Sequence, residues 1–273
     1  MDIYFIVLYF FVYSFLGWCT EVAFAACKEH RFVNRGFLNG PFCPIYGFGV
    51  SMVIALLMPY RSNLILLYVA SVVLVTVLEG VTGWAMDKLF HNKWWDYSKM
   101  PLNIGGYVCL LFSLIWGAAC VVIIHWVHPV IHHGLALIPK TVGVILIFFL
   151  GILLIADTCV TASAIFKFNR RLEHMERIAS ELHELSEQLG ENIYSTTVRA
   201  MDAAVEELYE RKQDAEENIR AHAAELKRRY SELMQTPDKV TVRLLRAFPL
   251  SESRRHKERV AEIRRQLREK LKK

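Results

Sequence analysis

Carboxylates inside otherwise apolar stretches are the residues of this chain that could do chemistry. Glu21 and Glu79 each lie near the end of an apolar run, and a basic loop follows each run. Acids at such positions are costly, face protein or water, and commonly bind ions or carry protons. The surroundings of these two acids are therefore the candidate functional site.

The elements that must position these acids are apolar helices of membrane length. A bilayer core of roughly 30 Å requires about 20 apolar residues per helix. The 273-residue chain is 54% hydrophobic, and no strand-like alternation competes with a helical interpretation. We predict an all-α polytopic membrane protein with five spans: Ile3–Cys27, Ile45–Met58, Asn63–Leu89, Leu102–Val127 and Thr141–Phe168.

The distribution of basic residues predicts which side each loop faces. Loop one, after the first span, and loop three, after the third, carry three Lys or Arg residues each, whereas loops two and four carry one each. Short loops rich in Lys and Arg stay in the cytoplasm. We therefore expect a plasma-membrane protein with loops one and three and the C-terminus in the cytoplasm, and with the N-terminus outside.

This topology places three acids in the inner half of the membrane. Counting back from Lys28, Lys88 and Lys167 at 1.5 Å per residue puts Glu21, Glu79 and Asp157 roughly 10, 13 and 15 Å inside the cytoplasmic boundary. Each acid costs about 2.5–3.5 kcal/mol on insertion scales if it faces lipid. The cost predicts that these side chains face protein partners or water.

Loops one and three share an unusual composition. Both contain several Gly and Pro residues, which rule out a continuous helix, yet both are too apolar for solvated loops. Broken backbone at a membrane boundary is tolerated where protein or water covers it. The polar cluster that we expect at these loops contains Glu21, Arg35, Asn39, Glu79, Asp87, Trp94, Trp95, Asp96, Tyr97 and Asn103.

Two interpretations of this cluster remain open. It is either a polar pocket in the cytoplasmic half, with acids paired to Arg35 or to a cationic ligand, or a buried ion-pair network that fixes helix packing. Trp94, Trp95 and Tyr97 are typical of headgroup anchors, and a cation-binding face is the alternative. A short similarity between the two halves, centred on Leu38-Asn39 and Leu102-Asn103, would place loops one and three side by side.

Four segments carry a resemblance to a known family: GWCTE (17–21), NRGFLNGPFCPIYGFG (34–49), LEGVTGWAMDKLFHNKWWDYS (78–98) and PLNIGGYVCLLFSLIWG (101–117). Over roughly residues 1–165 the chain resembles the CmpB-like bacterial membrane proteins of the ABC-transporter type IV family. The resemblance implies a permease, and the helical region after residue 169 lies outside it.

Several other functions lack their motifs. The sequence has no G-x-x-x-x-G-K-[ST], so the chain does not hydrolyse ATP by the P-loop mechanism, and a permease would need a separate ATPase subunit or an ion gradient. The run HWVHPVIHH (125–133) is expected in an outer loop, where Pro129 interrupts the helix and no carboxylate or cysteine lies nearby, so we predict no metal site. No cofactor is expected.

The C-terminal third is polar and helical. We predict three domains: a transmembrane domain (1–168), a cytoplasmic coiled coil or helical hairpin (169–235) and a basic amphipathic tail (236–273). Heptad positions run from Met175 to Leu189 and from Val198 through Met201 and Val205 to Leu226, which permits either a hairpin within one chain or a homo-oligomer. The tail carries 13 basic and 5 acidic residues and is expected to bind membrane lipid rather than nucleic acid.

The leading functional prediction is a permease-like membrane transport component with a cytoplasm-facing polar site and no ATPase of its own. A membrane enzyme that uses Glu21 and Glu79 as acid–base groups on a lipid-soluble substrate is the first alternative. A scaffold that recruits a partner through its coiled coil is the second. A non-enzymatic role is favoured.

Overall fold

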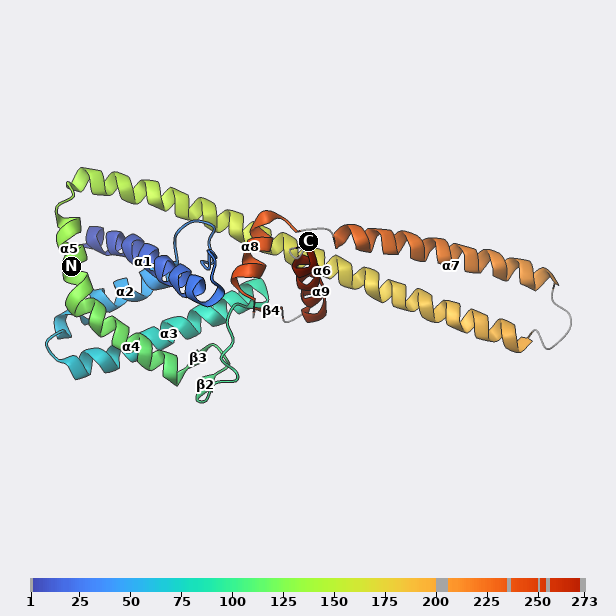
Figure 1. Ribbon diagram of the computed structural model, residues 1–273, viewed down its shortest axis with the longest axis horizontal. Coiled ribbons are helices and arrows are strands. Elements are labelled where there is room, and N and C mark those ends of the chain that lie inside the picture. The colour runs from blue at the N-terminus through green and yellow to red at the C-terminus, as the bar shows by residue number, and fades with distance from the viewer. Residues whose placement is uncertain (1, 200–205, 235–236, 250, 254–255, 271–273) are drawn as a thin grey trace. The chain divides into compact units, whose positions relative to one another are not determined.

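The computed structural model divides the chain into two compact units (Figure 1). It describes residues 2–199, 206–234, 237–249, 251–253 and 256–270. The first unit comprises Met1–Phe166 and Asp238–Arg255, and the second comprises Lys167–Pro237 and His256–Lys273. The segment that we predicted as one tail is therefore divided between the two units.

The predicted fold class is confirmed, because the described chain is mostly helical and four helices are long and apolar enough to cross a membrane. These are Ile3–Glu29, Leu64–Phe90, Leu110–Ala136 and Lys140–Glu191. The second predicted span corresponds to a shorter apolar helix, Pro44–Tyr60. The total of five spans stays a prediction.

The two helices that lead into loops one and three are built alike. Helices α1 (Ile3–Glu29) and α3 (Leu64–Phe90) have 27 residues each. Asp2 and Asn63 cap their N-termini with a side-chain oxygen, which satisfies backbone N–H groups that have no partner in the helix. Both helices end at a histidine with left-handed backbone, His30 (φ 53°) and His91 (φ 54°).

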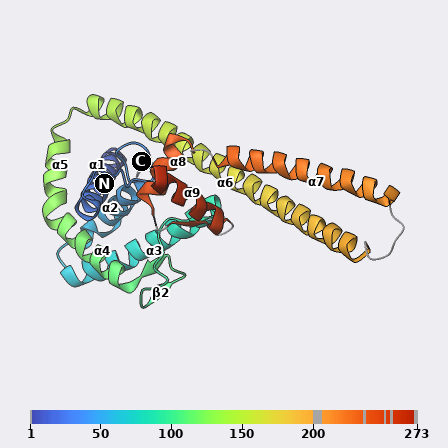
Figure 2. The same cartoon turned by 45° about the vertical axis from the view of Figure 1, so that its right-hand side comes forward.

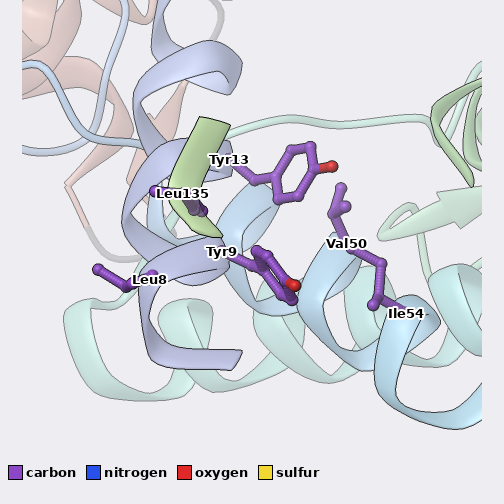
Figure 3. Close-up of a cluster of buried hydrophobic side chains, with 6 residues drawn as sticks. All are labelled: Leu8, Tyr9, Tyr13, Val50, Ile54 and Leu135. Atoms are coloured by element: carbon purple, nitrogen blue, oxygen red, sulfur yellow. The ribbon is translucent and has the colours of Figure 1, made fainter. Parts of the chain in front are cut away.

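Helix α2 (Pro44–Leu57) returns from loop one, packs against α1 and continues as the short 3₁₀ helix η1 (Met58–Tyr60). At Gly47 a Cβ atom would collide with the Ser14 hydroxyl and the Phe10 backbone oxygen, so the close approach of the two helices requires glycine. Further along, Tyr9 and Tyr13 point toward Val50 and Ile54 in a buried cluster that also contains Leu8 and Leu135 (Figure 3).

The fourth predicted span is shifted toward the C-terminus. Its expected first residues form a hairpin of β2 (Asn103–Ile104) and β3 (Val108–Cys109) instead. Helix α4 (Leu110–Val122), the π-helical turn η2 (Ile123–Val127) and α5 (His128–Ala136) then follow without a break, as Figure 2 shows. The prediction that Pro129 interrupts the helix was wrong: the helix continues through the proline, and the π-helical turn η2, with its different hydrogen-bond pattern, comes directly before it.

Helix α6 (Lys140–Arg199) contributes residues 140–166 to the first unit. A short strand β1 (Asn92–Lys93) in loop three pairs with β4 (Glu252–Ser253), which follows α8 (Lys239–Ala247). One buried cluster beside loops one and three combines residues from four segments of this unit: Phe90, Trp94, Ile165 and Leu244. The C-terminal segment 238–255 is thus part of the folded membrane unit.

The second unit contains the rest of α6, α7 (Glu206–Leu233) and α9 (Lys257–Lys270). Arg171 donates to the Leu233 carbonyl oxygen, and Glu181 pairs with His222, so α6 and α7 run antiparallel. Leu172, Met175, Leu226, Val260 and Ile263 are buried. The apolar face of the tail that we expected to bind lipid contains Val260, Ile263 and Leu271. Val260 and Ile263 are buried by packing, whereas Leu271 and the heptad residues Met201 and Val205 lie outside the described residues.

Candidate functional site

Loop one is an ordered turn, and Asn34 fixes its conformation. The Asn34 side-chain oxygen accepts hydrogen bonds from the Trp18 indole (2.8 Å) and from the Gly36 backbone N–H (3.1 Å). The Asn34 amide donates to the Asn39 carbonyl oxygen at 2.7 Å. One amide side chain therefore closes the loop on itself and attaches it to α1.

Asp157 of α6 holds the other end of loop one. Its carboxylate accepts from the Asn39 backbone N–H (3.1 Å), the Asn39 side-chain amide (2.8 Å) and the Gly40 backbone N–H (2.6 Å). The Asn39 amide also donates to the Thr161 hydroxyl. Hydrogen bonds to an ionised acceptor are about twice as strong as neutral ones. The carboxylate is thus satisfied by backbone and side-chain N–H groups of loop one, which explains how the helix keeps this acid.

Glu21 has a cation beside it. Arg35 Nε lies 3.4 Å from one Glu21 oxygen, and the Tyr46 hydroxyl of α2 donates to the other at 2.6 Å. The Arg35 guanidinium also lies over the Phe24 ring. The expected pairing of an acid with Arg35 is therefore present, and its acid is Glu21.

Glu79 has a different environment. Its side chain is only 8% exposed, and one carboxylate oxygen accepts from the Tyr97 hydroxyl at 3.2 Å. Among the residues that the structure describes, the other oxygen is buried without a hydrogen-bond partner, and no Lys or Arg pairs with the carboxylate. An uncompensated buried acid is unfavourable for stability, so its retention requires another explanation.

Tyr97 connects the surroundings of the two glutamates. Burial raises the pKa of Tyr97 above its usual value, and the negative charges of Glu79 and, more weakly, Glu21 raise it further. The phenol therefore keeps its proton and acts as the donor to Glu79. Its ring stacks on Phe112 of α4, with ring centroids 5.0 Å apart, which fixes the hydroxyl in place.

Asp96 and Asn103 organise loop three rather than contact the glutamates. Asp96 accepts from the Ser98 hydroxyl and backbone N–H and lies 3.5 Å from Lys93 Nζ, and the hydrogen bond with the Ser98 hydroxyl is the main cause of its lowered pKa. Asn103 donates to the Met100 carbonyl and accepts from the Gly106 N–H. Gly106 has a positive φ of 75°, which favours glycine at this turn.

Loops one and three lie side by side, as the similarity of the two halves led us to expect. The Trp94 ring meets Phe37 of loop one edge to face, with centroids 5.2 Å apart, and meets Phe248 of the C-terminal segment in the same way at 5.1 Å. Trp94 is consequently 9% exposed. Trp95 donates its indole N–H to the Tyr107 carbonyl oxygen, and the Tyr107 hydroxyl donates to Asp87.

Three of the four histidines of the run 125–133 have partners within the protein. Tyr9 and Tyr13 form hydrogen bonds with His132 and His128, and His125 contacts the Arg61 carbonyl oxygen. In the part of the chain that the structure describes, no three His, Cys, Asp or Glu side chains are placed to hold a metal ion.

Four residues of this region were absent from the predicted cluster: Tyr46, Tyr107, Asp157 and Arg243. The tyrosines resemble ordinary interfacial aromatics in the sequence. Asp157 was identified as an acid of the inner half without a partner that would join it to loop one. No motif links Arg243 to a loop about 200 residues earlier.

The fold and these polar groups define a multi-pass α-helical membrane protein with acids inside its helices. The family model described as putative ABC-transporter type IV matches residues 8–162, more than half of the chain, and the chain belongs to this family. The match, together with the apolar helices, marks a membrane protein related to transport. No curated protein and no solved structure matches the chain.

Proposed function

We propose that this chain is the membrane-spanning component of a transporter and that Glu79 is the centre of its cytoplasm-facing site. In this proposal Tyr97, Glu21, Tyr46 and Arg35 complete the site, and its ligand is a small cation or a proton. The ATP-hydrolysing component, if ATP drives transport, is a separate subunit.

The observation that carries the proposal is the contrast among the three acids of the inner half. Arg35 accompanies Glu21, and three N–H donors satisfy Asp157. Glu79 alone of the three combines 8% exposure with an oxygen that has no partner among the described residues. A negative site without a protein cation is suited to a ligand that brings the positive charge.

Orientation follows from the charge pattern. Loops one and three carry the basic residues and lie together in the structure, whereas Asp2 and Lys140, which approach each other to 3.9 Å, mark the opposite ends of α1 and α6. The positive-inside rule then assigns loops one and three to the cytoplasm. In this assignment Glu21, Glu79 and Asp157 lie in the cytoplasmic halves of their helices.

A charge-movement recording tests the proposal. The full chain is reconstituted into liposomes on a solid-supported membrane, and current is recorded after a pH jump and, separately, after a jump in methylammonium concentration. We expect a current with at least one of these cations, and its loss in Glu79→Gln. Asp2→Asn is the matched control, because it changes an exposed carboxylate but keeps an N-cap side chain.

Equal currents in wild type and Glu79→Gln would contradict the proposal. The proposal would also be contradicted if no current appeared with the chain alone and none appeared in membranes that contain its complete set of transporter subunits. Hydrolysis of ATP by the purified chain would refute the assignment of that activity to a separate subunit.

A further inference from the structure

A segment far from loop one in the sequence completes the surroundings of the proposed site. Arg243 of α8 donates to three acceptors of loop one: the Gly36 carbonyl oxygen (2.7 Å), the Phe37 carbonyl oxygen (2.9 Å) and the Asn39 side-chain oxygen (3.0 Å). Five fixed N–H donors make a guanidinium suited to several acceptors at once, which a lysine ammonium does not reproduce.

These contacts connect Arg243 to an acid inside the membrane helices. Asn39, which accepts from Arg243, donates its own N–H groups to Asp157. Burial lowers the pKa of Arg243 from its usual value, and the nearby Asp157 carboxylate acts in the opposite direction. Arg243 therefore supplies the positive charge that balances Asp157, with Asn39 between them.

The same segment is also attached to loop three. Strand β4 pairs with β1, with Ser253 opposite Asn92 and Glu252 opposite Lys93. Leu244 is buried in the cluster that contains Phe90 and Trp94. Helix α8 and strand β4 thus join the loop that carries Arg35 to the loop that carries Tyr97.

Arg35 immediately precedes Gly36, whose carbonyl oxygen accepts from Arg243. The position of the Arg35 side chain beside Glu21 depends on the conformation of this short loop. Three helices hold loop one: α1 through Trp18, which donates to Asn34, α6 through Asp157, and α8 through Arg243. Arg243 is the one of the three that lies outside residues 8–162, the range that the family model matches.

We infer that Arg243 is a positioning residue of the proposed site, and that helix α8 and strand β4 form a clamp that keeps Arg35 on Glu21 by joining loops one and three. The inference rests on the proposed function, since it concerns the same site. It assigns to the C-terminal segment a role in the membrane unit itself: release of the clamp leaves Glu21 without its cation.

Chemical modification of Glu21 tests this role in the full chain, held in lipid nanodiscs. A water-soluble carbodiimide with an amine nucleophile modifies carboxyl groups, and mass spectrometry quantifies each product. Glu29 is the internal reference, because it lies on the same helix, pairs with Arg31 and has a side-chain exposure of 29%, close to the 27% of Glu21. Arg246→Gln is the matched control, because Arg246 is exposed on the same helix as Arg243.

We expect Arg243→Gln to raise the modification of Glu21 relative to Glu29 several-fold and to speed amide exchange in residues 34–40, while Arg246→Gln matches wild type. Arg243→Lys, which keeps the charge and folds more readily, should also raise the ratio. General loosening of the protein would raise the modification of both glutamates and leave their ratio unchanged.

Two results would overturn the inference: an unchanged Glu21-to-Glu29 ratio in folded Arg243→Gln, or a wild-type ratio in Arg243→Lys if Arg243→Gln does not fold. Neither measurement of the modification ratio depends on transport activity. Failure of the proposed function would appear instead as an unaltered current in Glu79→Gln, whatever the ratio.

Discussion

At the scale of single residues, the same type of side chain has different partners at three positions in the membrane helices. Glu21 has a guanidinium, Asp157 has N–H donors from loop one, and Glu79 has one phenol. A buried acid that loses its compensation is strongly destabilising, whereas a half-exposed ion pair contributes little. Glu21 and Asp157 are compensated by these partners, whereas Glu79 has no such compensation among the described residues.

The Glu21–Arg35 pair gives a prediction at this scale. Glu21→Gln keeps the acceptor for Tyr46 but removes the charge, and both partners are about one-third exposed. A double-mutant cycle of Glu21→Gln and Arg35→Gln should give a coupling free energy of about 0.5–1 kcal/mol in unfolding measurements. A cycle of Glu79→Gln and Arg35→Gln should give none, and substantial coupling there would contradict the observed pairing.

At the scale of the elements, the sequence predicts the helices better than their junctions. Long apolar runs identify α1, α3 and α6, because the bilayer length sets the number of residues required. The hairpin of β2 and β3 escaped prediction, since strands of two residues each are too short to show an alternating pattern. Pro129 was wrongly predicted to interrupt its helix, because the sequence does not reveal the π-helical turn that precedes the proline.

Close packing of α1 and α2 gives a prediction at the element scale. Gly47→Ala places a Cβ against the Phe10 backbone oxygen, which cannot move without shifting α1. Overpacking of this kind should lower the free energy of unfolding by about 1–3 kcal/mol. Gly151→Ala is the matched control: nothing lies within 4 Å of the added atom, and replacing glycine in a helix should stabilise by roughly 0.5–1 kcal/mol. Equal effects of the two changes in a denaturation assay would refute the packing argument.

At the scale of the whole molecule, the candidate site depends on residues that are distant in the sequence. The sequence could bring Glu21, Arg35 and Tyr97 to one region, because alternating spans return loops one and three to the same side of the membrane. It could not identify Arg243, because hydrogen bonds to backbone carbonyls leave no pattern in either segment. The sequence also could not show that Arg35 pairs with Glu21 rather than Glu79, because the position of Arg35 depends on how loop one folds.

Membrane orientation can be tested with single cysteines in a cysteine-free background. Asn34 is unsuitable, because its side chain closes loop one. Phe32, which is 71% exposed in loop one, and exposed Lys99 in loop three are better positions. Cysteines there should resist an impermeant maleimide in intact cells, whereas a cysteine at Ser62 should react. Reaction at position 32 together with protection at position 62 would invert the proposed orientation.

The central claim is that the Glu79 carboxylate serves a ligand rather than the fold. The most direct test measures the unfolding free energy and the cation-dependent current of Glu79→Gln in the same liposome preparation. Gln still accepts from the Tyr97 hydroxyl and removes a buried charge, so we predict that the unfolding free energy stays within about 1 kcal/mol of wild type or rises, while the current is lost. A fall of about 3–5 kcal/mol, the cost of breaking a buried ion pair, with current lost only in proportion to unfolded protein, would contradict the account.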